Sequence, residues 1–312
     1  MLLEVNDLVK HFPPPGRDRR VQAVNGVSFA VSAGQTFGLV GESGCGKSTL
    51  ARLIVRLYRE TAGTVFFEGL NITALRRRSL KDFRRQAQMV FQDPYASLNP
   101  RMTVRSTLLD PLRVYRVGTA RQQEGRVEEL LGLVGLDRRY AARYPHEFSG
   151  GQRQRIAIAR ALALSPRLIV LDEPVSALDV SVQAQILNLL AELQQKFGLT
   201  YLFISHDLSV VEYMCDHIGV MYLGCIVEKG EREDIFQRCR HPYTRALLSA
   251  VPAPGGAAGE QIILGGDPPS PADPPAGCHF SPRCPQAAEI CRREKPPLRD
   301  LSPTHAAACH FL

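Results

Sequence analysis

Residues 41–49 read Gly-Glu-Ser-Gly-Cys-Gly-Lys-Ser-Thr and are the most informative segment of the sequence. An apolar run typical of a buried parallel strand precedes it at 37–40, and apolar residues at helical spacing follow it from Leu50 to Leu57. A glycine-rich loop between a strand and a helix is typical of phosphate binding, because its N–H groups and the helix N-terminus face an anion. We therefore predict that Lys47 reaches the terminal phosphates of a nucleotide and that Ser48 ligates magnesium. A glycine turn with an accidental Lys-Ser pair does not fit these flanks.

Length and apolar patterning bound the fold class. The 312 residues suffice for one large domain with an appendage or for two ordinary domains. The best candidate for a membrane span, 213–227, is broken by Asp216 and His217 and falls short of the roughly 18 uninterrupted residues that a spanning helix needs. The first residues lack the charged-then-apolar pattern of a secretion signal, so we expect the chain to remain in the cytoplasm.

The chain carries an excess of positive charge, with a net charge of +7 and an isoelectric point near 9.1. The basic residues cluster at 17–20 and 76–85, without the interleaved aromatic residues of a single-strand binder and without a helix-turn-helix or zinc-finger pattern. We therefore predict no nucleic-acid partner, and we interpret the clusters as solvated helix faces near lipid headgroups.

Short apolar segments at 3–5, 24–31 and 64–67, separated by turn residues, predict a small antiparallel sheet that flanks the phosphate loop. Phe12, just beyond the first segment, is a candidate to stack on the nucleotide base, since an aromatic face suits a purine. A half-buried packing role is the alternative for this ring. From 100 to 143 the pattern becomes helical and predicts a helical insert.

Two further loops carry candidate binding groups, which are a polar side chain in the first and backbone N–H groups without an acceptor in the second. Gln92 ends the apolar run 86–92, and because Pro94 disfavours helix at the residue before it, Gln92 is predicted to lie in a loop at a strand end. Ser149 is a predicted helix N-cap that is followed by two glycines, and such a helix start leaves N–H groups bare. The second loop therefore predicts a second anion site.

Titratable residues follow two buried strands. The run 168–171 is followed by Asp172 and Glu173. Two adjacent carboxylates at the end of a buried strand need a cation or a proton to compensate their negative charge. Asp172 suits a magnesium shell and Glu173 suits a base that orients water. The run 201–204 leads to His206; a lone histidine is usually structural, but ligands of open α/β sheets bind at such strand ends.

These motifs together resemble the nucleotide-binding subunit of an ABC transporter. The resemblance rests on the phosphate loop with Gln92 and His206, and on the runs Ser-Gly-Gly-Gln at 149–152, Leu-Asp-Glu-Pro at 171–174 and Ala-Leu-Asp at 177–179. It covers residues 1–245. Phe148 stands where the family more often has leucine, which is a mild departure.

The resemblance implies roles for individual residues. Glu173 would be the catalytic base, His206 the γ-phosphate switch, and Gln92 a nucleotide sensor that contacts the membrane subunit. Phe12 would stack on adenine, and Asp179 would form an inter-subunit contact. The implied ATP-binding set is Phe12, Gly41, Ser43, Gly44, Cys45, Gly46, Lys47, Ser48, Thr49, Ser149, Gly150, Gly151, Gln152 and Asp179, and the implied Mg²⁺ ligands are Ser48, Gln92 and Asp172.

The last part of the chain narrows the resemblance. The runs at 241–248, 268–271 and 277–284 resemble the C-terminal extension of bacterial oligopeptide and dipeptide importer ATPases, and nickel and glutathione importers share parts of it. We place the boundary between a nucleotide-binding domain, 1–245, and this extension, 246–312. The Pro- and Gly-rich segment 252–275 is interpreted as a linker over the catalytic domain.

The extension is too short to hold a hydrophobic core of its own and needs a cross-link such as a bound metal. It contains four of the eight cysteines, and a reducing compartment disfavours disulfides. Zinc usually binds at least one closely spaced cysteine pair, which is lacking, but the short ferredoxin spacing is lacking too, so spacing leaves zinc, an iron–sulfur cluster and free thiols open. Some dipeptide importer ATPases carry a cluster in the matching tail, and this resemblance favours a 4Fe-4S cluster on Cys278, Cys284, Cys291 and Cys309.

We therefore predict an α/β fold of the P-loop NTPase type, an ABC-type ATPase with a parallel core sheet, an antiparallel β subdomain, a helical subdomain and a cysteine-rich C-terminal extension. By resemblance, ATP hydrolysis powers uptake of di- or oligopeptides through two transmembrane permease subunits. The other expected partners are a second ABC ATPase subunit, commonly a paralogue, and an extracytoplasmic peptide-binding protein, so the chain would lie peripherally on the cytoplasmic face of the inner membrane.

Three alternatives to peptide import were weighed. A nickel or glutathione importer has the same architecture. A soluble ATPase of DNA repair or translation would be expected to carry two cassettes or a DNA-binding insertion, and the sequence has one phosphate loop and no such insertion. A nucleotide-binding regulator without turnover is disfavoured by the intact Lys47, Asp172 and Glu173.

Overall fold

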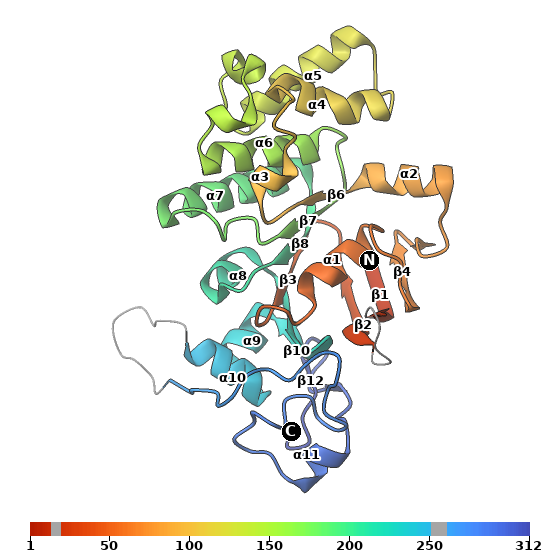
Figure 1. Cartoon of the computed structure of the whole chain (residues 1–312), viewed down its shortest axis with the longest axis vertical. Coiled ribbons are helices and arrows are strands. Elements are labelled where there is room, and N and C mark those ends of the chain that lie inside the picture. The colour runs from red at the N-terminus through yellow and green to blue at the C-terminus, as the bar shows by residue number, and fades with distance from the viewer. Residues whose placement is uncertain (14–19, 251–260) are drawn as a thin grey trace. The chain divides into compact units, whose positions relative to one another are not determined.

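The computed structural model describes residues 1–13, 20–250 and 261–312 (Figure 1). Part of the basic run at 17–20 and part of the expected linker at 252–275 lie outside these residues. The chain divides into two units: the phosphate-loop unit holds Met1–Val31, Thr36–Thr73 and Phe203–Leu312, and the helical unit holds Ser32–Gln35 and Ala74–Leu202. This division does not follow the expected boundary after residue 245, which stays a prediction.

The phosphate-loop unit contains a four-stranded antiparallel sheet in the order β2-β1-β4-β5. Its strands are β1 (Leu3–Phe12), β2 (Val21–Val31), β4 (Ala62–Phe67) and β5 (Leu70–Asn71). The β1–β2 register runs from Leu3 opposite Val31 to Phe12 opposite Val21, with bulges between. The expected antiparallel sheet is therefore confirmed, with longer strands than the apolar segments alone indicated.

A second sheet of this unit positions the phosphate loop. Strand β3 (Thr36–Val40) is buried along its whole length and leads through the loop into α1 (Lys47–Ile54). It pairs in parallel with β9 (His217–Tyr222). On its other side, Leu39 accepts a hydrogen bond from the N–H of Ser205, directly after β8 (Thr200–Ile204). The phosphate loop and the residues after β8 thus leave the same edge of the sheet.

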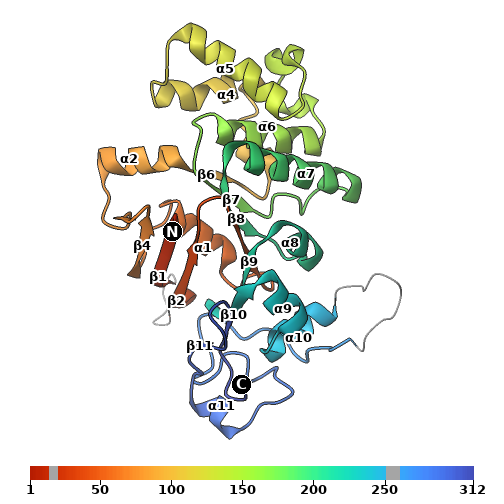
Figure 2. The same ribbon diagram turned by 180° about the vertical axis from the view of Figure 1, so that it is seen from behind.

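The C-terminal extension adds strands to this sheet. Beyond β9 the order continues through antiparallel β10 (Cys225–Glu231) to β12 (Ala306–Ala307) and β11 (Arg299–Asp300). The C-terminus lies beside α11 (Glu289–Arg293) in both views (Figure 1, Figure 2). The remaining helices of the unit are α8 (Leu208–Met214), α9 (Arg232–Arg238) and α10 (Pro242–Ser249).

Aromatic packing explains how so short an extension is held. Phe280 is 1% exposed, and its ring centroid lies 5.3 Å from that of Tyr222 on β9 and 5.4 Å from that of Tyr243 on α10. The two tyrosine rings are 4.7 Å apart. Since burial of large aromatic surface dominates packing energetics, the extension uses the apolar core of the phosphate-loop unit in place of one of its own.

The helical unit holds the start of β8, then β7 (Leu168–Asp172) and β6 (Ala87–Val90), which pair in parallel with Ala87 opposite Leu168. Strand β6 is shorter than the expected run 86–92, because Gln86 ends the preceding helix. The expected helical insert is confirmed. The helical elements are α2 (Arg77–Gln86), α3 (Pro94–Ser97), α4 (Val104–Val114), α5 (Ala120–Leu133), η1 (Arg138–Ala142), η2 (Pro145–Glu147), α6 (Gly150–Leu162) and α7 (Val180–Phe197).

In the part of the chain that the structure describes, none of the helices combines the length and the apolar character that crossing a membrane requires.

Candidate functional site

The phosphate loop is closed around its lysine. Lys47 is 5% exposed, and its ammonium group donates to the carbonyl oxygens of Gly41 at 2.7 Å and Glu42 at 2.9 Å. Gly46 caps α1 with a φ of 108°, and a Cβ there would lie 2.0 Å from the carbonyl oxygen of Ala23. The loop therefore requires glycine at this position both for its left-handed backbone and for space. Such a tight backbone, with an ammonium group folded into it, suits a phosphate cradle.

The side chain of Cys45 is buried, so this residue presents only its backbone at the surface of the loop. Burial raises the pKa of its thiol, an effect that the nearby Lys47 ammonium partly offsets. The thiol sulfur lies 3.8 Å from that ammonium group. A neutral, buried thiol fills space beneath the loop, so any nucleotide contact of Cys45 is expected from its N–H.

Phe12 ends β1 and is half-buried. Its ring packs edge-on against Tyr58, with centroids 5.6 Å apart, and the Lys10 ammonium lies 4.8 Å from the ring centre. Both expected roles of Phe12 are compatible with this arrangement, since the ring packs on one neighbour and keeps part of its surface accessible.

His206 is exposed directly after β8, in the same unit as the phosphate loop. The next residue, Asp207, caps α8 by accepting the N–H of Ser209 at 2.9 Å. This cap fixes where the helix begins and leaves His206 on the connection between strand and helix. The histidine therefore lies at a carboxyl strand end, as expected from the sequence.

The carboxylates lie in the helical unit. Asp172 is the last residue of β7 and is 2% exposed, and Glu173 follows it. Gln92, just after β6, donates from Nε2 to Oε2 of Glu173 at 2.8 Å. Strands β6 and β7 are parallel neighbours, so their carboxyl ends meet at one edge and bring these polar side chains together. Sequence reasoning placed each of them correctly at a strand end.

Glu173 also has a strained backbone. Its φ is 49°, in the left-handed region that residues other than glycine rarely occupy. The carbonyl oxygen of Glu173 accepts a hydrogen bond from the Ser176 hydroxyl at 3.2 Å, which helps to hold the turn. Strained residues of this kind concentrate at functional sites, because the surrounding structure must hold them in place.

The predicted second anion site is the start of α6. Ser149 and Gln152 form a capping box, in which the Ser149 N–H donates to Oε1 of Gln152 at 3.1 Å and the Gln152 N–H donates to Oγ of Ser149 at 3.3 Å. Each of these two side chains therefore accepts a hydrogen bond from the backbone N–H of the other residue. The amides of Gly150 and Gly151 belong to the first turn, where N–H groups have no acceptor within the helix and lie at its positive end.

The residues after Glu173 pack against this helix start. A Cβ on Gly151 would lie 2.4 Å from Cγ1 of Val182 on α7, and one on Gly150 would lie 3.2 Å from Cδ2 of Leu178. Asp179, at the N-cap position of α7, is exposed, and the next residue, Val180, is 81% exposed. Exposure of a large apolar residue beside Asp179 is compatible with the expected contact to another subunit.

The cysteines of the extension gather without forming a recognisable metal site. The N–H of Cys278 donates to the carbonyl oxygen of Cys291 at 2.7 Å. Burial raises the pKa of Cys278, and the thiols of Cys291 and Cys284 raise it further; burial, then Cys309 and Cys291, raise the pKa of Cys284. Among residues 1–13, 20–250 and 261–312, however, no group of three or more His, Cys, Asp or Glu side chains could hold a metal ion. The expected iron–sulfur cluster is not supported by such a site and stays a proposal.

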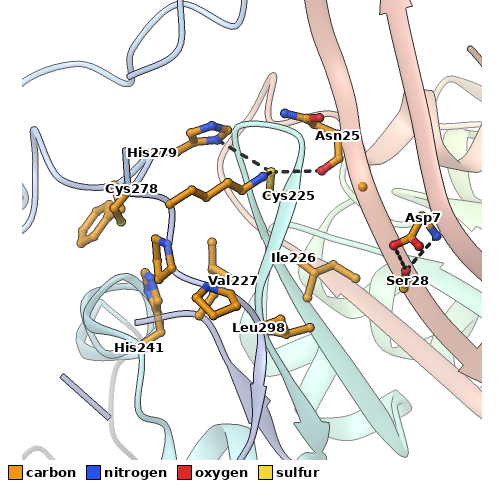
Figure 3. A pocket seen from close by; sticks show the side chains of 16 residues that line it. Asp7, Asn25, Ser28, Cys225, Ile226, Val227, His241, Cys278, His279 and Leu298 are labelled. Carbon is orange, nitrogen blue, oxygen red and sulfur yellow. Dashed lines mark hydrogen bonds between the residues drawn. The ribbon is translucent and has the colours of Figure 1, made fainter. Parts of the chain in front are cut away.

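Two features of the extension were not foreseen from the sequence. A cavity of about 460 Å³ is lined by the extension, by β10 and by residues of β1 and β2 (Figure 3). At this cavity the Cys225 thiol lies 3.3 Å from the Lys295 ammonium and 3.7 Å from Nδ1 of His279. In addition, Arg283 forms an ion pair with Glu42 of the phosphate loop. The only sequence signal for this pair was an acidic residue inside a loop that binds anions.

Comparisons with known proteins agree with this geometry. A family model described as "ABC transporter" matches residues 24–176, and one described as "Oligopeptide/dipeptide transporter, C-terminal region" matches residues 227–291. The oligopeptide transport ATP-binding protein AppF of Bacillus subtilis (strain 168) is 53% identical over 99% of this chain and 97% of its own length. The probable peptide ABC transporter ATP-binding protein y4tS of Sinorhizobium fredii is 52% identical over 99% of this chain and 89% of its own.

Solved structures give the same result. The ATP-binding cassette MJ0796, in a dimeric post-hydrolysis state bound to ADP and Pi, matches with a TM-score of 0.67 and 29% identity over 74% of this chain and 98% of the cassette. CbiO1 of Clostridium perfringens, part of the ABC transporter complex cbiONQ, matches with a TM-score of 0.67 and 26% identity over 76% of this chain and 91% of its own. The chain therefore belongs to the ATP-binding proteins of ABC transporters and combines the ABC ATPase domain with the C-terminal region of the oligopeptide/dipeptide branch.

Proposed function

We propose that the chain hydrolyses ATP and thereby powers uptake of di- or oligopeptides through a pair of membrane permeases. The observation that carries the enzymatic part is the contact between Gln92 and Glu173 beside the buried Asp172. It holds one carboxylate in a fixed orientation next to another, at the edge of a sheet where ligands bind. The names and extent of the relatives support peptides as the cargo class.

The phosphate loop is proposed to supply affinity for ATP. Lys47, Ser48 and Thr49, with the N–H groups of Gly41, Ser43, Gly44, Cys45 and Gly46, would hold the phosphates, and Phe12 would stack on adenine. Lys47 would exchange its bonds to the carbonyls of Gly41 and Glu42 for bonds to phosphate oxygens. Ser48, Gln92 and Asp172 would hold Mg²⁺, which neutralises charge on the phosphates when it is bound.

Glu173 is proposed to act as the base. Its carboxylate would accept a proton from the attacking water while the water oxygen bonds to the γ-phosphorus and the bond to the ADP oxygen breaks. Gln92 would keep the carboxylate oriented, and His206 would contact the γ-phosphate and report its presence. Because Asp172 is buried and Glu173 is strained, the geometry is set before ATP arrives.

The start of α6 is proposed to close over ATP bound to a second ATPase subunit. One chain needs a single phosphate-binding helix end per nucleotide, yet this chain has two. Ser149, Gly150, Gly151 and Gln152, together with Asp179, would therefore complete the partner's site. ATP would favour the closed pair of ATPase subunits because its phosphates gain contacts there, and hydrolysis of ATP would allow the pair to open.

Mixing two inactive variants tests this arrangement. Lys47→Ala disables the phosphate loop and Ser149→Arg blocks the start of α6, so each variant alone should be inactive. A mixture should recover ATPase activity, because heterodimers contain one composite site with neither change. Activity from a strictly monomeric preparation, or no recovery in a mixture that forms heterodimers, would contradict the proposal.

The proposed partners are two transmembrane permeases, a second ATPase subunit that is identical or a paralogue, and an extracytoplasmic peptide-binding protein. Tyr95, three residues after Gln92, is 64% exposed, and its ring lies 3.6 Å from the Arg153 guanidinium carbon. The permease contact is proposed at this loop, around Gln92. The subunit would then lie peripherally on the cytoplasmic face of the inner membrane. If the reconstituted importer takes up nickel or glutathione and no peptide, the proposed peptide cargo is wrong.

We also propose that Cys278, Cys284, Cys291 and Cys309 ligate a 4Fe-4S cluster. The thiols of Cys278 and Cys284 each lie near enough to neighbouring cysteine thiols to feel their charge, and thiolate ligands suit iron and sulfide, which supports the proposal. Anaerobic purification should give a brown protein with about four irons per chain. Cys284→Ser should lower the iron content, whereas Cys239→Ser should not. A colourless protein with one zinc would contradict the cluster.

A further inference from the structure

The phosphate loop is tied to the C-terminal extension through the side chain of Glu42. Arg283 donates from Nη1 to Oε2 of Glu42 at 2.7 Å and from Nη2 to Oε1 at 3.0 Å, so both carboxylate oxygens are engaged. The two residues are 241 positions apart in the sequence. A two-pronged pair of this kind fixes the direction as well as the distance between its partners.

A second contact holds the backbone of the same residue. The N–H of Glu42 donates to the hydroxyl of Tyr243 at 2.9 Å. Tyr243 is fully buried in the aromatic packing with Tyr222 and Phe280, so its hydroxyl has little freedom to move. Residues from beyond position 240 thus hold Glu42 by its side chain and by its main chain.

The residue that is held is itself a neighbour of Lys47. The carbonyl oxygen of Glu42 accepts a bond from the Lys47 ammonium at 2.9 Å, beside the bond to Gly41. The contacts therefore form a continuous chain from Arg283 and Tyr243 through Glu42 to Lys47. All four residues lie in the phosphate-loop unit.

The burial of this pair indicates a role in position more than in stability. The Arg283 side chain is 7% exposed and that of Glu42 is 28% exposed. Removing charges from water offsets much of the attraction between them, and apolar replacements of such pairs are often neutral for stability. A pair placed on a loop with three glycines in six residues, 41–46, is better explained by restriction of that loop.

We propose that Arg283 and Tyr243 are positioning residues for ATP binding, and that the extension holds the phosphate loop in its binding-competent form through Glu42. The inference rests on the phosphate-binding role proposed above for Lys47. If the contact is lost, the loop samples other backbone arrangements and only a fraction remains competent. A competent fraction of about one tenth raises the apparent Kd about tenfold.

The first test compares two arginines of the extension in the full-length subunit. Arg283→Ala should raise the Kd for ATP roughly tenfold and raise KM more than it lowers kcat, because the loop contacts ground state and transition state alike. Arg293→Ala is the matched control, since Arg293 pairs with Glu289 at 2.9 Å on the exposed face of α11. It should leave the Kd unchanged. Equal Kd values for wild type, Arg283→Ala and Arg293→Ala would overturn the proposal.

Two further measurements separate positioning from general loss of structure. Exchange of the charges, Glu42→Arg with Arg283→Glu, should recover ATP affinity relative to Arg283→Glu alone, and a lack of recovery would count against the pair. Tyr243→Phe keeps the buried ring and removes only the hydroxyl, so it should raise the Kd several-fold with little change in kcat. An unchanged Kd in Tyr243→Phe would remove Tyr243 from the proposal.

Lys47→Ala distinguishes this inference from the function on which it rests. If Lys47→Ala abolishes ATP binding while Arg283→Ala does not alter it, the proposed loop function stands and the positioning role fails. If Lys47→Ala leaves the Kd for ATP unchanged, the proposed function of the loop fails first.

Discussion

The side-chain amide of Gln92 donates to Oε2 of Glu173 at 2.8 Å and joins the ends of two parallel strands. This contact orients the side chain of the proposed base. Gln92→Ala should lower kcat by roughly tenfold or more, because it removes both this contact and a proposed Mg²⁺ ligand, and it should change KM for ATP less, because Lys47 and the loop amides would still hold the phosphates. Steady-state kinetics would check both. Gln88→Ala, on the same β6, is the control, and an equal loss of kcat there would contradict the specific role of Gln92.

The strand-end residues of the site could be predicted from the sequence because their signals are local. Gln92 and Asp172 each follow an apolar run, and the parallel strands β6 and β7 bring them to one edge. His206 also follows an apolar run, just after β8. The glycines around Lys47 likewise mark a loop whose backbone geometry only glycine allows. Periodicity and turn chemistry were sufficient for these elements.

What was missed depends on contacts between distant parts of the chain. The pair of Glu42 and Arg283 joins residues 241 positions apart, and no local pattern marks it. The strand of Ala306–Ala307 has only two residues and forms because β10 offers an edge, not because of propensity. The aromatic packing of Phe280 likewise exists only after the extension has folded onto β9 and α10.

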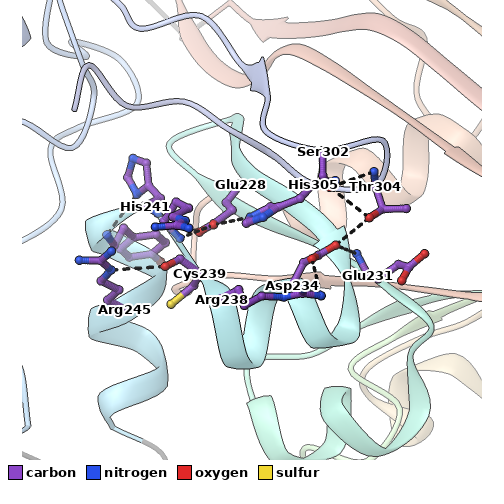
Figure 4. A network of polar contacts seen from close by, with 12 residues as sticks. Glu228, Glu231, Asp234, Arg238, Cys239, His241, Arg245, Ser302, Thr304 and His305 are labelled. Carbon is purple, nitrogen blue, oxygen red and sulfur yellow. Dashed lines mark hydrogen bonds and ion pairs between the residues drawn. The ribbon is translucent and has the colours of Figure 1, made fainter. Parts of the chain in front are cut away.

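Glu228 ties the extension to β10 and should be important for stability. Its fully buried carboxylate accepts the N–H of Arg240 at 2.6 Å and that of His241 at 3.1 Å, and it lies 2.8 Å from Nε2 of His305 (Figure 4). Glu228→Ala leaves buried donors without an acceptor and should lower the free energy of unfolding by roughly 3 kcal/mol or more. Chemical denaturation would measure this.

The control for that change is Glu289→Ala. Glu289 pairs with Arg292 and Arg293 on the surface, and its side chain is 61% exposed. Exposed pairs contribute little, so the free energy of unfolding should change by less than about 1 kcal/mol. Equal effects of the two changes would contradict the role given to Glu228.

His241 should make stability depend on pH. It is 1% exposed, its Nδ1 accepts the N–H of Tyr243 at 3.1 Å, and burial lowers its pKa to about 4 from an ordinary value of 6.5. As the pH falls, the unfolded chain binds a proton at His241 before the folded chain does. The contribution of neutral His241 to the free energy of unfolding is therefore complete above about pH 6.5 and is lost as the pH falls towards about 4. The loss amounts to roughly 3 kcal/mol.

His241→Asn tests this dependence, because asparagine can still cap α10 but does not titrate. The free energy of unfolding of the wild type should fall more steeply between pH 6.5 and pH 4 than that of the variant. The difference between the two profiles removes the contributions of all other titrating groups. Parallel pH profiles would show that His241 is not responsible.

ATP binding and turnover by Glu173→Gln, measured in the full chain, test the proposed hydrolysis directly. In the proposed mechanism Lys47, Ser48 and the loop amides supply the affinity for ATP, whereas the Glu173 carboxylate acts only on the attacking water. The variant should therefore bind ATP with the wild-type Kd and hydrolyse it roughly 100-fold more slowly or worse. Wild-type turnover by Glu173→Gln would contradict the assignment of the base.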